Sequence, residues 1–295
     1  MKSIYRIVLL TVLFTVIKAE AQQDPNYSFY GYNMNLINPS FAGTGEKTNV
    51  GLNMRSQWAG VKGAPQTQSL FFGTPVGSKV GLGLSIINDK TFIESQTSIA
   101  VDFSYKLQLN DELNLYLGIK AGFNSYDVNT NGLISYGIGE DASLMNLDGG
   151  FSPNVGLGAH LKHENYFVSF SIPKLLTPDR LEENNGTVSL GTDKRHMYFS
   201  GGYTIKLQGE MALKPMVLVR YVDASPLSID LTTIWTLNSI FDIGAAYRFD
   251  EGISGLFIFK VSPNFQLGYA YEASFENSVR NLDNGTHEVM MIFKL

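Results

Sequence analysis

From about residue 48 to the last residue, hydrophobic side chains alternate with polar or small ones. In 115–124, Leu115, Leu117, Ile119, Ala121 and Phe123 occupy every second position. Successive side chains of a β-strand point to opposite faces, so this pattern predicts strands with one apolar face and one polar or small face. The same alternation recurs in 80–86, 99–106, 227–237 and 265–272.

The length of these segments separates a membrane barrel from a soluble β-sandwich, which also alternates. Soluble strands average about 5 to 6 residues, whereas tilted strands that cross a membrane need about 9 to 11. The segments here are about as long as membrane-crossing strands, and we count about fourteen of them. They are 48–57, 66–74, 79–88, 97–107, 113–125, 154–162, 165–172, 196–207, 211–222, 227–237, 241–249, 255–261, 265–274 and 286–295.

The connections between the predicted strands alternate in length. Those after even-numbered strands are tight, and three of the odd-numbered ones are long, namely 126–153, 173–195 and 274–285. Outer-membrane barrels have short periplasmic turns and longer external loops, and a sandwich has no reason to sort its loops in this way. We therefore expect an all-β fold, a transmembrane antiparallel up-and-down barrel with both termini on the periplasmic side.

The polar face of the strands should line the barrel interior, because a charge facing lipid costs about 2–4 kcal/mol at mid-membrane. Charges of both signs fall on that face, which favours side-chain pairs across the lumen over a selective ion path. A barrel of this size has room for water, so we expect something to fill the lumen. The inward residues are Arg55, Asp102, Lys120, His160, Lys206, Asp230, Asp242, Arg248, Lys260 and Glu272.

The first residues read as a secretory signal peptide. Lys2 and Arg6 precede an apolar run at 7–17, and Ala19 and Ala21 fit an A-x-A cleavage site. The run is shorter than the roughly 20 residues of a membrane-spanning helix. The alternative is a buried N-terminal helix. We expect cleavage near Ala21 and three parts: a signal peptide at 1–21, an N-terminal periplasmic or luminal segment at 22–47, and the barrel at 48–295.

Composition narrows the function. The chain has no cysteine, which excludes disulfides, thiolate metal sites and a lipid anchor on cysteine. Its net charge is −5 without a basic block, so nucleic-acid binding is not expected. We expect no cofactor and no metal: the four histidines lack ligand spacing, and the calcium-loop-like stretch from Asp127 to Gly132 has Ile138 where a bidentate glutamate belongs. A barrel hydrolase is neither indicated nor excluded.

The segment 22–47 lacks any lasting period and is rich in aromatics and asparagine. Tyr27, Phe29, Tyr30 and Tyr32 come close together, and Asn38-Pro39 marks a turn. A disordered tail would be poor in aromatics, so we expect this segment to pack against the lumen, the periplasmic mouth or a partner.

Three stretches carry a resemblance to the PorP/SprF family of outer-membrane proteins. They are Asp24-Pro25 with 36–43 (LINPSFAG), 55–60 (RSQWAG) with 63–68 (GAPQTQ), and 80–85 (VGLGLS) with Asn88-Asp89; 115–124 and 285–293 fit as well. The resemblance covers essentially the whole chain after the signal peptide. It implies an outer-membrane barrel of a Gram-negative bacterium that works in type IX secretion and gliding motility and has no catalytic residues.

The resemblance also implies partners. Members of the family help to secrete an adhesin-type protein or hold it at the cell surface, and some work with a periplasmic peptidoglycan-binding protein. A passive diffusion channel is the alternative function. The residues that we expect to contact a partner or a luminal plug are Asn38, Pro39, Phe41, Gly43, Arg55, Trp58, Gly60 and Pro65. Simpler interpretations remain open: Pro39 and Gly43 shape the turn into the first strand, and Trp58 is a membrane-interface residue.

Overall fold

The structure is a computed structural model that describes residues 25–129, 151–176, 194–223, 225–238, 240–275 and 284–295. The signal peptide, the cleavage site, and residues 130–132 and Ile138 of the calcium-loop-like stretch lie outside these ranges. Among the described residues, no helix is long and apolar enough to cross a membrane.

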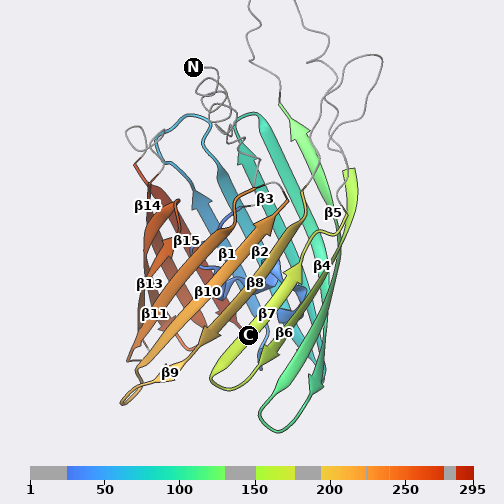
Figure 1. The fold of residues 1–295 in the computed structure, drawn as a ribbon, viewed down its shortest axis with the longest axis vertical. Coiled ribbons are helices and arrows are strands. Elements are labelled where there is room, and N and C mark those ends of the chain that lie inside the picture. Colours follow the sequence, from blue (N-terminus) through green and yellow to red (C-terminus); the bar gives the residue numbers. More distant parts are fainter. Residues whose placement is uncertain (1–24, 130–150, 177–193, 224, 239, 276–283) are drawn as a thin grey trace, which may run out of the picture.

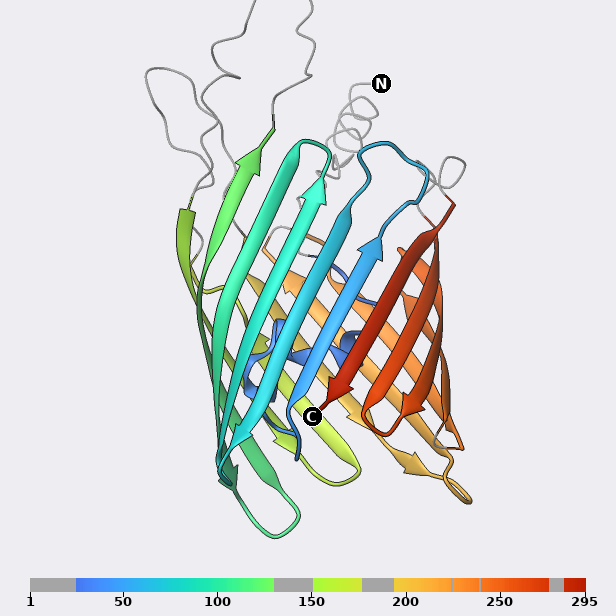
Figure 2. The same cartoon turned by 180° about the vertical axis from the view of Figure 1, so that it is seen from behind.

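Antiparallel strands form a closed barrel (Figures 1 and 2). β8 and β9 are separated only by Thr204 and both pair with β10, so they are two parts of one of the fourteen barrel strands. β1 pairs with β15 and closes the wall. The strands are β1 Asn49–Ser56, β2 Gln66–Val76, β3 Val80–Thr91, β4 Glu94–Gln108, β5 Asn114–Val128, β6 Phe151–Lys162, β7 Tyr166–Ile172, β8 His196–Tyr203, β9 Ile205–Lys206, β10 Ala212–Val222, β11 Ser228–Leu237, β12 Phe241–Arg248, β13 Gly252–Ser262, β14 Phe265–Ser274 and β15 Thr286–Lys294.

The predicted fourteen-stranded barrel is confirmed, although several strands run about three residues beyond their predicted ends, as in the hairpin of β3 and β4. Alternation predicts that these strands stop at 88 and start again at 97, but pairing continues to Thr91 and Glu94. The extra residues are polar on both faces, as expected where strands project beyond the membrane. Side chains still hold the extension, since Thr67 Oγ1 of β2 donates to Asp89 Oδ1 at 2.6 Å.

The two faces of the wall differ as the alternation predicts. Large apolar side chains face outward, for example Val101 and Ile119, whereas nine of the ten residues that we placed in the lumen are buried or partly buried there. Lys206 is the exception. It lies on the exposed two-residue strand β9, beyond the interruption of the strand at Thr204, and pairs with Glu164 in the turn between β6 and β7.

Residues 25–43 form an irregular plug inside the barrel (the blue segment in Figures 1 and 2). The plug contains a 3₁₀ turn η1 Tyr30–Tyr32, a single α-helical turn α2 Met34–Ile37 and a second 3₁₀ turn η2 Pro39–Phe41. Each is short because Gly31, Asn33 and Pro39 interrupt regular helix. No residue of the plug is exposed. The aromatic segment therefore packs against the lumen, one of the three sites that its composition allowed.

The plug runs lengthwise between the two ends of the barrel. We call the end with the long connections the outer end and the end with tight turns the periplasmic end. Asn26 Nδ2 lies 3.4 Å from Glu251 Oε2 in the outer connection between β12 and β13. After the plug, Lys47 Nζ donates to Asn264 in the periplasmic turn between β13 and β14, at 3.0 Å. The C-terminal Leu295 is periplasmic beside Thr48, but the expectation that the N-terminal side is also periplasmic is wrong for residue 25.

Candidate functional site: the filled lumen

Apolar residues of the plug pack into two hydrophobic clusters of the barrel interior. Phe29, which is 1% exposed, enters a cluster formed by inward residues of β11 to β15, including Ile234, Ile258 and Met290. The second cluster joins Tyr27, Tyr30, Met34, Leu36 and Ile37 of the plug to Phe71, Tyr198 and Leu218 of the wall. Fully burying an aromatic or aliphatic side chain contributes about 1.5–3 kcal/mol, so these contacts hold the plug firmly.

Glycines on the inner face of the wall make room for the plug. A Cβ added to Gly83 would lie 2.9 Å from the Cβ of Ala42, and one added to Gly118 would lie 2.5 Å from the carbonyl carbon of Pro39. Gly81 and Gly158 approach the same stretch equally closely. The sequence suggested that Gly81 and Gly83 give room to neighbours; the neighbour is the turn at 38–43.

Asn38 shapes this turn and ties it to the wall. Its Oδ1 accepts hydrogen bonds from the backbone N–H of Ser40 at 3.0 Å and from the Ser40 hydroxyl at 2.6 Å. Its Nδ2 donates to the carbonyl oxygen of Phe170 on β7 at 3.3 Å. Gly43 ends the turn with a φ of +62° against the backbone of Thr74, a conformation that favours glycine. Asn38 and Gly43 are therefore suited to fix the path of the plug, and Pro39 starts η2.

A ring stack holds the same turn from the side. The imidazole of His160 lies between Phe41 of the plug, with ring centroids 4.0 Å apart, and Tyr116 of β5, at 4.4 Å. His160 Nδ1 is 3.0 Å from the hydroxyl of Ser40. Among the described residues, no three His, Cys, Asp or Glu side chains are grouped closely enough to hold a metal ion. His160 contacts the plug through stacking and one hydrogen bond.

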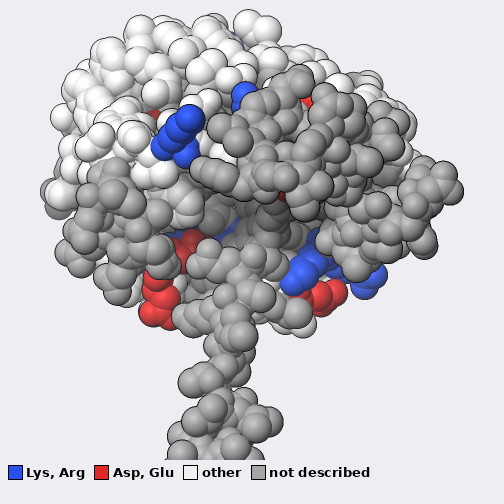
Figure 3. Space-filling view, turned by 90° about the horizontal axis from the view of Figure 1, so that it is seen from above, with Lys and Arg blue, Asp and Glu red and all other residues white. Residues whose placement is uncertain are grey.

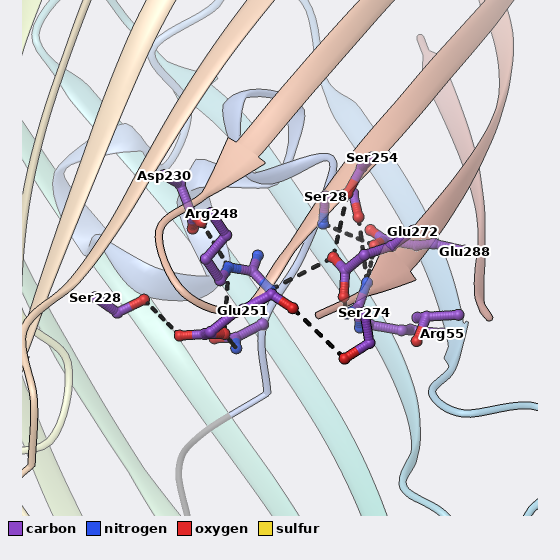
Figure 4. Close-up of polar contacts among 12 residues, drawn as sticks. Ser28, Arg55, Ser228, Asp230, Arg248, Glu251, Ser254, Glu272, Ser274 and Glu288 are labelled. Atoms are coloured by element: carbon purple, nitrogen blue, oxygen red, sulfur yellow. Dashed lines mark hydrogen bonds and ion pairs between the residues drawn. The ribbon is translucent and has the colours of Figure 1, made fainter. Parts of the chain in front are cut away.

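Glu288 of β15 is the polar anchor at the beginning of the plug (Figure 4). Its carboxylate accepts from the backbone N–H groups of Ser28 at 2.7 Å and Phe29 at 3.3 Å. It also accepts from Asn53 Nδ2 at 2.8 Å and pairs with Arg55 at 3.1 Å. Glu288 is 1% exposed. Burying a charge is costly unless hydrogen-bond or ion-pair partners satisfy it. Two of the four partners of Glu288 belong to the plug, so the plug helps to stabilise this buried carboxylate.

The charges around this anchor form a continuous chain across the wall (Figure 4). Glu272 bridges Arg55 at 2.8 Å and Arg248 at 3.4 Å. Arg248 also pairs with Asp230 at 2.5 Å and with Glu251 at 3.6 Å, next to Asn26. The mixed charges of the inner face thus pair, as the sequence suggested. Seen from the outer end, charged groups of both signs are visible around the described part of the mouth (Figure 3).

Two further ion pairs lie deeper in the lumen. Lys120 pairs with Asp102 at 2.9 Å, and Lys260 pairs with Asp242 at 2.6 Å. The hydroxyl of Tyr32 donates to Asp242 at 2.9 Å. Burial raises the pKa of this hydroxyl, and the carboxylate of Asp242 raises it further, so Tyr32 stays protonated and keeps donating.

The loop 57–65 lies apart from the plug, at the outer end. Trp58 has a φ of +48°, and its N–H donates to Thr286 Oγ1 at 3.2 Å. Gly60 is exposed, and the carbonyl oxygen of Pro65 accepts from the N–H of Gln57 at 2.9 Å. Of the eight residues singled out, Asn38, Pro39, Phe41 and Gly43 belong to the plug or its end, and Arg55 touches Ser28 of the plug at 3.2 Å. Trp58, Gly60 and Pro65 form a separate surface.

Sequence reasoning missed Glu288, although β15 carried a signal. Val289, Met291 and Phe293 mark its lipid-facing side, yet Met290 and Ile292 on the opposite side are apolar too and are buried. Apolar residues on both faces of a barrel strand indicate that something dry covers its inner face. A carboxylate on that inner face then needs a partner, and Arg55 and the plug supply it.

The described cavities lie on either side of the plug. A small one of about 50 Å³ lies at the outer end beside Pro25 and Pro173, and a larger one of about 660 Å³ lies at the periplasmic end beside Gly43 and Lys106. The middle of the lumen is occupied by the packed plug. This arrangement is that of a filled barrel whose interior binds its own chain.

The chain is similar to several solved structures. Among solved structures, the outer membrane protein Omp33 of Acinetobacter baumannii is 12% identical, with a TM-score of 0.48 over 84% of this chain and 98% of its own. The toluene transporter TbuX of Ralstonia pickettii is 11% identical, with a TM-score of 0.49 over 87% of this chain and 91% of its own. No curated protein matches the chain.

A family match covers nearly the whole sequence. Residues 19–293 match the family described as the type IX secretion system membrane protein PorP/SprF. The match spans the plug and every barrel strand, and it agrees with the resemblance carried by the stretches at 36–43 and 55–68. The protein therefore belongs to the PorP/SprF family and is an outer-membrane β-barrel associated with the type IX secretion system.

Proposed function

We propose that this barrel is a non-enzymatic component that helps to secrete an adhesin-type protein or holds it at the cell surface. The observation that supports this role over a diffusion channel is the plug, which fills the lumen and is fixed by the buried carboxylate of Glu288. A barrel that is closed in this way offers its outer end as a binding surface. Family membership supplies the association with type IX secretion.

The loop 57–65 is the part of the described outer end that we propose as a contact for the secreted partner. Gly60 is exposed, and Trp58 is only partly buried, so both can meet another protein. Trp is among the residues enriched where proteins bind each other. We also propose that the signal peptide is cleaved near Ala21 and that the N-terminal segment covers 22–47, with the barrel following from 48. A periplasmic protein is the further partner that we propose.

Deletion of the gene tests the surface role. We expect the secreted protein to appear in the medium instead of on the cell, and a copy carrying Trp58→Ala and Gly60→Asp to restore less surface protein than the unchanged gene. Gln208→Ala in the exposed periplasmic turn between β9 and β10 is the control substitution and should restore it fully. If the deletion leaves both secretion and surface display unchanged, the proposal is wrong.

The diffusion channel remains the second candidate, and only one observation favours it: charged and small residues line the wall. Reconstitution in a planar bilayer separates the two. A filled lumen should give little or no steady conductance. Large and stable single-channel currents from the unchanged protein would favour the channel.

A further inference from the structure

Three lysines lie on the inner face of the wall at the periplasmic ends of β10, β13 and β15 (the lower end of the barrel in Figure 1). Lys214 is the third residue of β10, Lys260 is close to the end of β13, and Lys294 ends β15. Lys214 faces inward because its register partner is the buried Ile234, and Lys294 has the inward parity of the buried Ile292. Lys214 lies within electrostatic range of the other two lysines, so three ammonium groups share one part of the lumen.

One carboxylate faces these three lysines. Within the last three positions of β10–β15 at the periplasmic end, all of which the structure describes, Asp242 is the only acidic residue. Its Oδ1 accepts from Lys260 Nζ at 2.6 Å, and its Oδ2 accepts from the hydroxyl of Tyr32 at 2.9 Å. Glu210 in the turn before β10 and the terminal carboxylate of Leu295 belong to exposed residues, where water screens a charge. Three ammonium groups against one carboxylate leave an excess of two positive charges.

Lys214 and Lys294 differ from the other inward cations. Arg55, Lys120 and Arg248 each have a carboxylate within 4 Å. Neither Lys214 nor Lys294 makes a side-chain hydrogen bond or ion pair with another residue in the described ranges. Both are partly buried, and a charge that is partly removed from water is costly unless an opposite charge compensates it. An anion between these two lysines would supply that compensation.

A buried hydroxyl lies beside the same lysines. Thr236 on β11 is the register partner of Asp242, and it is two residues from Ile234, the register partner of Lys214. Thr236 is 7% exposed, and its Oγ1 has no hydrogen-bond partner within the described part of the chain. A buried polar group without a partner is unfavourable. A ligand oxygen that accepts from Thr236 would remove this cost, so the hydroxyl indicates a ligand with acceptor oxygens.

We propose that this part of the lumen binds a phosphate group, with its oxygens on the ammonium groups of Lys214 and Lys294 and on the hydroxyl of Thr236. A phosphate monoester carries a charge of about −1.5 to −2 at neutral pH, which matches the excess of two positive charges, whereas a single carboxylate would leave one of them. Lysine commonly binds phosphate as a point charge. The group can come from a membrane lipid or from a soluble phosphorylated molecule. The site is at the opposite end from the surface that we propose for the secreted protein, so either proposal can fail while the other stands.

Titration of the purified full-length protein in detergent with inorganic phosphate tests the site. Isothermal titration calorimetry gives the affinity, with chloride used to keep the ionic strength constant. We expect saturable binding, and we expect Lys214→Gln with Lys294→Gln to weaken it at least about tenfold, because both charge-assisted contacts are lost. The matched control is Lys79→Gln with Lys106→Gln, which removes the same charge from a cavity at the same end that is lined by four carboxylates. This control should change the affinity less than about twofold.

Thr236→Val separates loss of the site from loss of the fold. Valine has the shape of threonine, and the hydroxyl that it removes has no partner among the described residues. The free energy of unfolding in urea without phosphate should therefore not fall, while the affinity for phosphate should fall about fivefold. The proposal is wrong if phosphate shows no saturable binding, if both lysine pairs weaken it equally, or if the Thr236→Val protein binds phosphate as well as the unchanged protein.

Lipid nanodiscs distinguish the two sources of the phosphate group. The protein is inserted into nanodiscs of phosphatidylcholine, either alone or mixed with phosphatidic acid, whose head group is a phosphate monoester. If phosphatidic acid prevents the binding of inorganic phosphate, the head group of a lipid occupies the site. If inorganic phosphate binds equally well in both nanodiscs, the site takes a soluble phosphate.

Discussion

Replacing Glu288 with alanine should loosen the plug more than any other single change to a charged residue. The carboxylate serves four donors, two of them backbone N–H groups of the plug. A buried donor left without a partner costs about 1–3 kcal/mol, and removal of one partner of a buried ion pair costs about 3–5 kcal/mol. Arg55 keeps Glu272 at 2.8 Å, so the lower figure applies. We expect a loss of about 3 kcal/mol, or roughly a hundredfold shift in the ratio of seated to displaced plug.

Two experiments measure this shift between seated and displaced plug. Urea unfolding in detergent should show a drop in the free energy of unfolding of about 3 kcal/mol, and planar bilayers should show channel openings that the unchanged protein rarely gives. Glu112→Ala is the control, because that side chain is 80% exposed and its one ion pair within the described ranges is with His163. If the Glu288→Ala protein is as stable as the Glu112→Ala protein and shows as few channel openings, Glu288 does not anchor the plug.

The remaining predictions concern the fit and the direction of the plug. Gly118→Val should displace the turn at 38–43 and raise conductance, whereas Gly255→Val, with open space around its added Cβ, should not; equal behaviour would contradict the close fit. Phe29→Ala should lower the free energy of unfolding by about 3–5 kcal/mol in urea titration, and a change below about 1 kcal/mol would exclude Phe29 as an apolar anchor. A single cysteine at Asn26 should react with a membrane-impermeant maleimide on intact cells, and one at Asn264 only after lysis; the reverse order would refute the direction of the plug.

The wall could be predicted from the sequence because its signals are local. Period-two alternation fixes which residue of a strand faces lipid, and the strand at 115–124 shows this without any knowledge of its neighbours. Strand ends were less certain where alternation stops but pairing continues, as at Asn88 and Thr97. Prediction of the inward charges also held, except for Lys206, since the interruption of the strand at Thr204 carries no signal in the alternation.

The site could be predicted only in part, because it depends on contacts between distant residues. The aromatic composition of the N-terminal segment indicated that it packs against something. The residues of the segment alone do not indicate which surface it packs against. Ser28 and Glu288 are 260 positions apart, and their contact exists only once the barrel closes. The glycines on β3 indicated that a neighbour packs closely there, but they did not indicate which segment it is. The sequence predicted no direction for the plug, and the expected periplasmic N-terminal side does not hold at residue 25, because loop lengths orient the strands and not the segment before them.

The position of the plug relative to the barrel seam couples seating of the plug to closure of the barrel. The plug directly precedes β1, and β1 closes the barrel by pairing with β15. Glu288, on β15, therefore meets the N–H groups of Ser28 and Phe29 across the same seam that closes the wall. A chain that lacks its final strand has neither a seam nor an anchor, so seating of the plug marks a complete barrel.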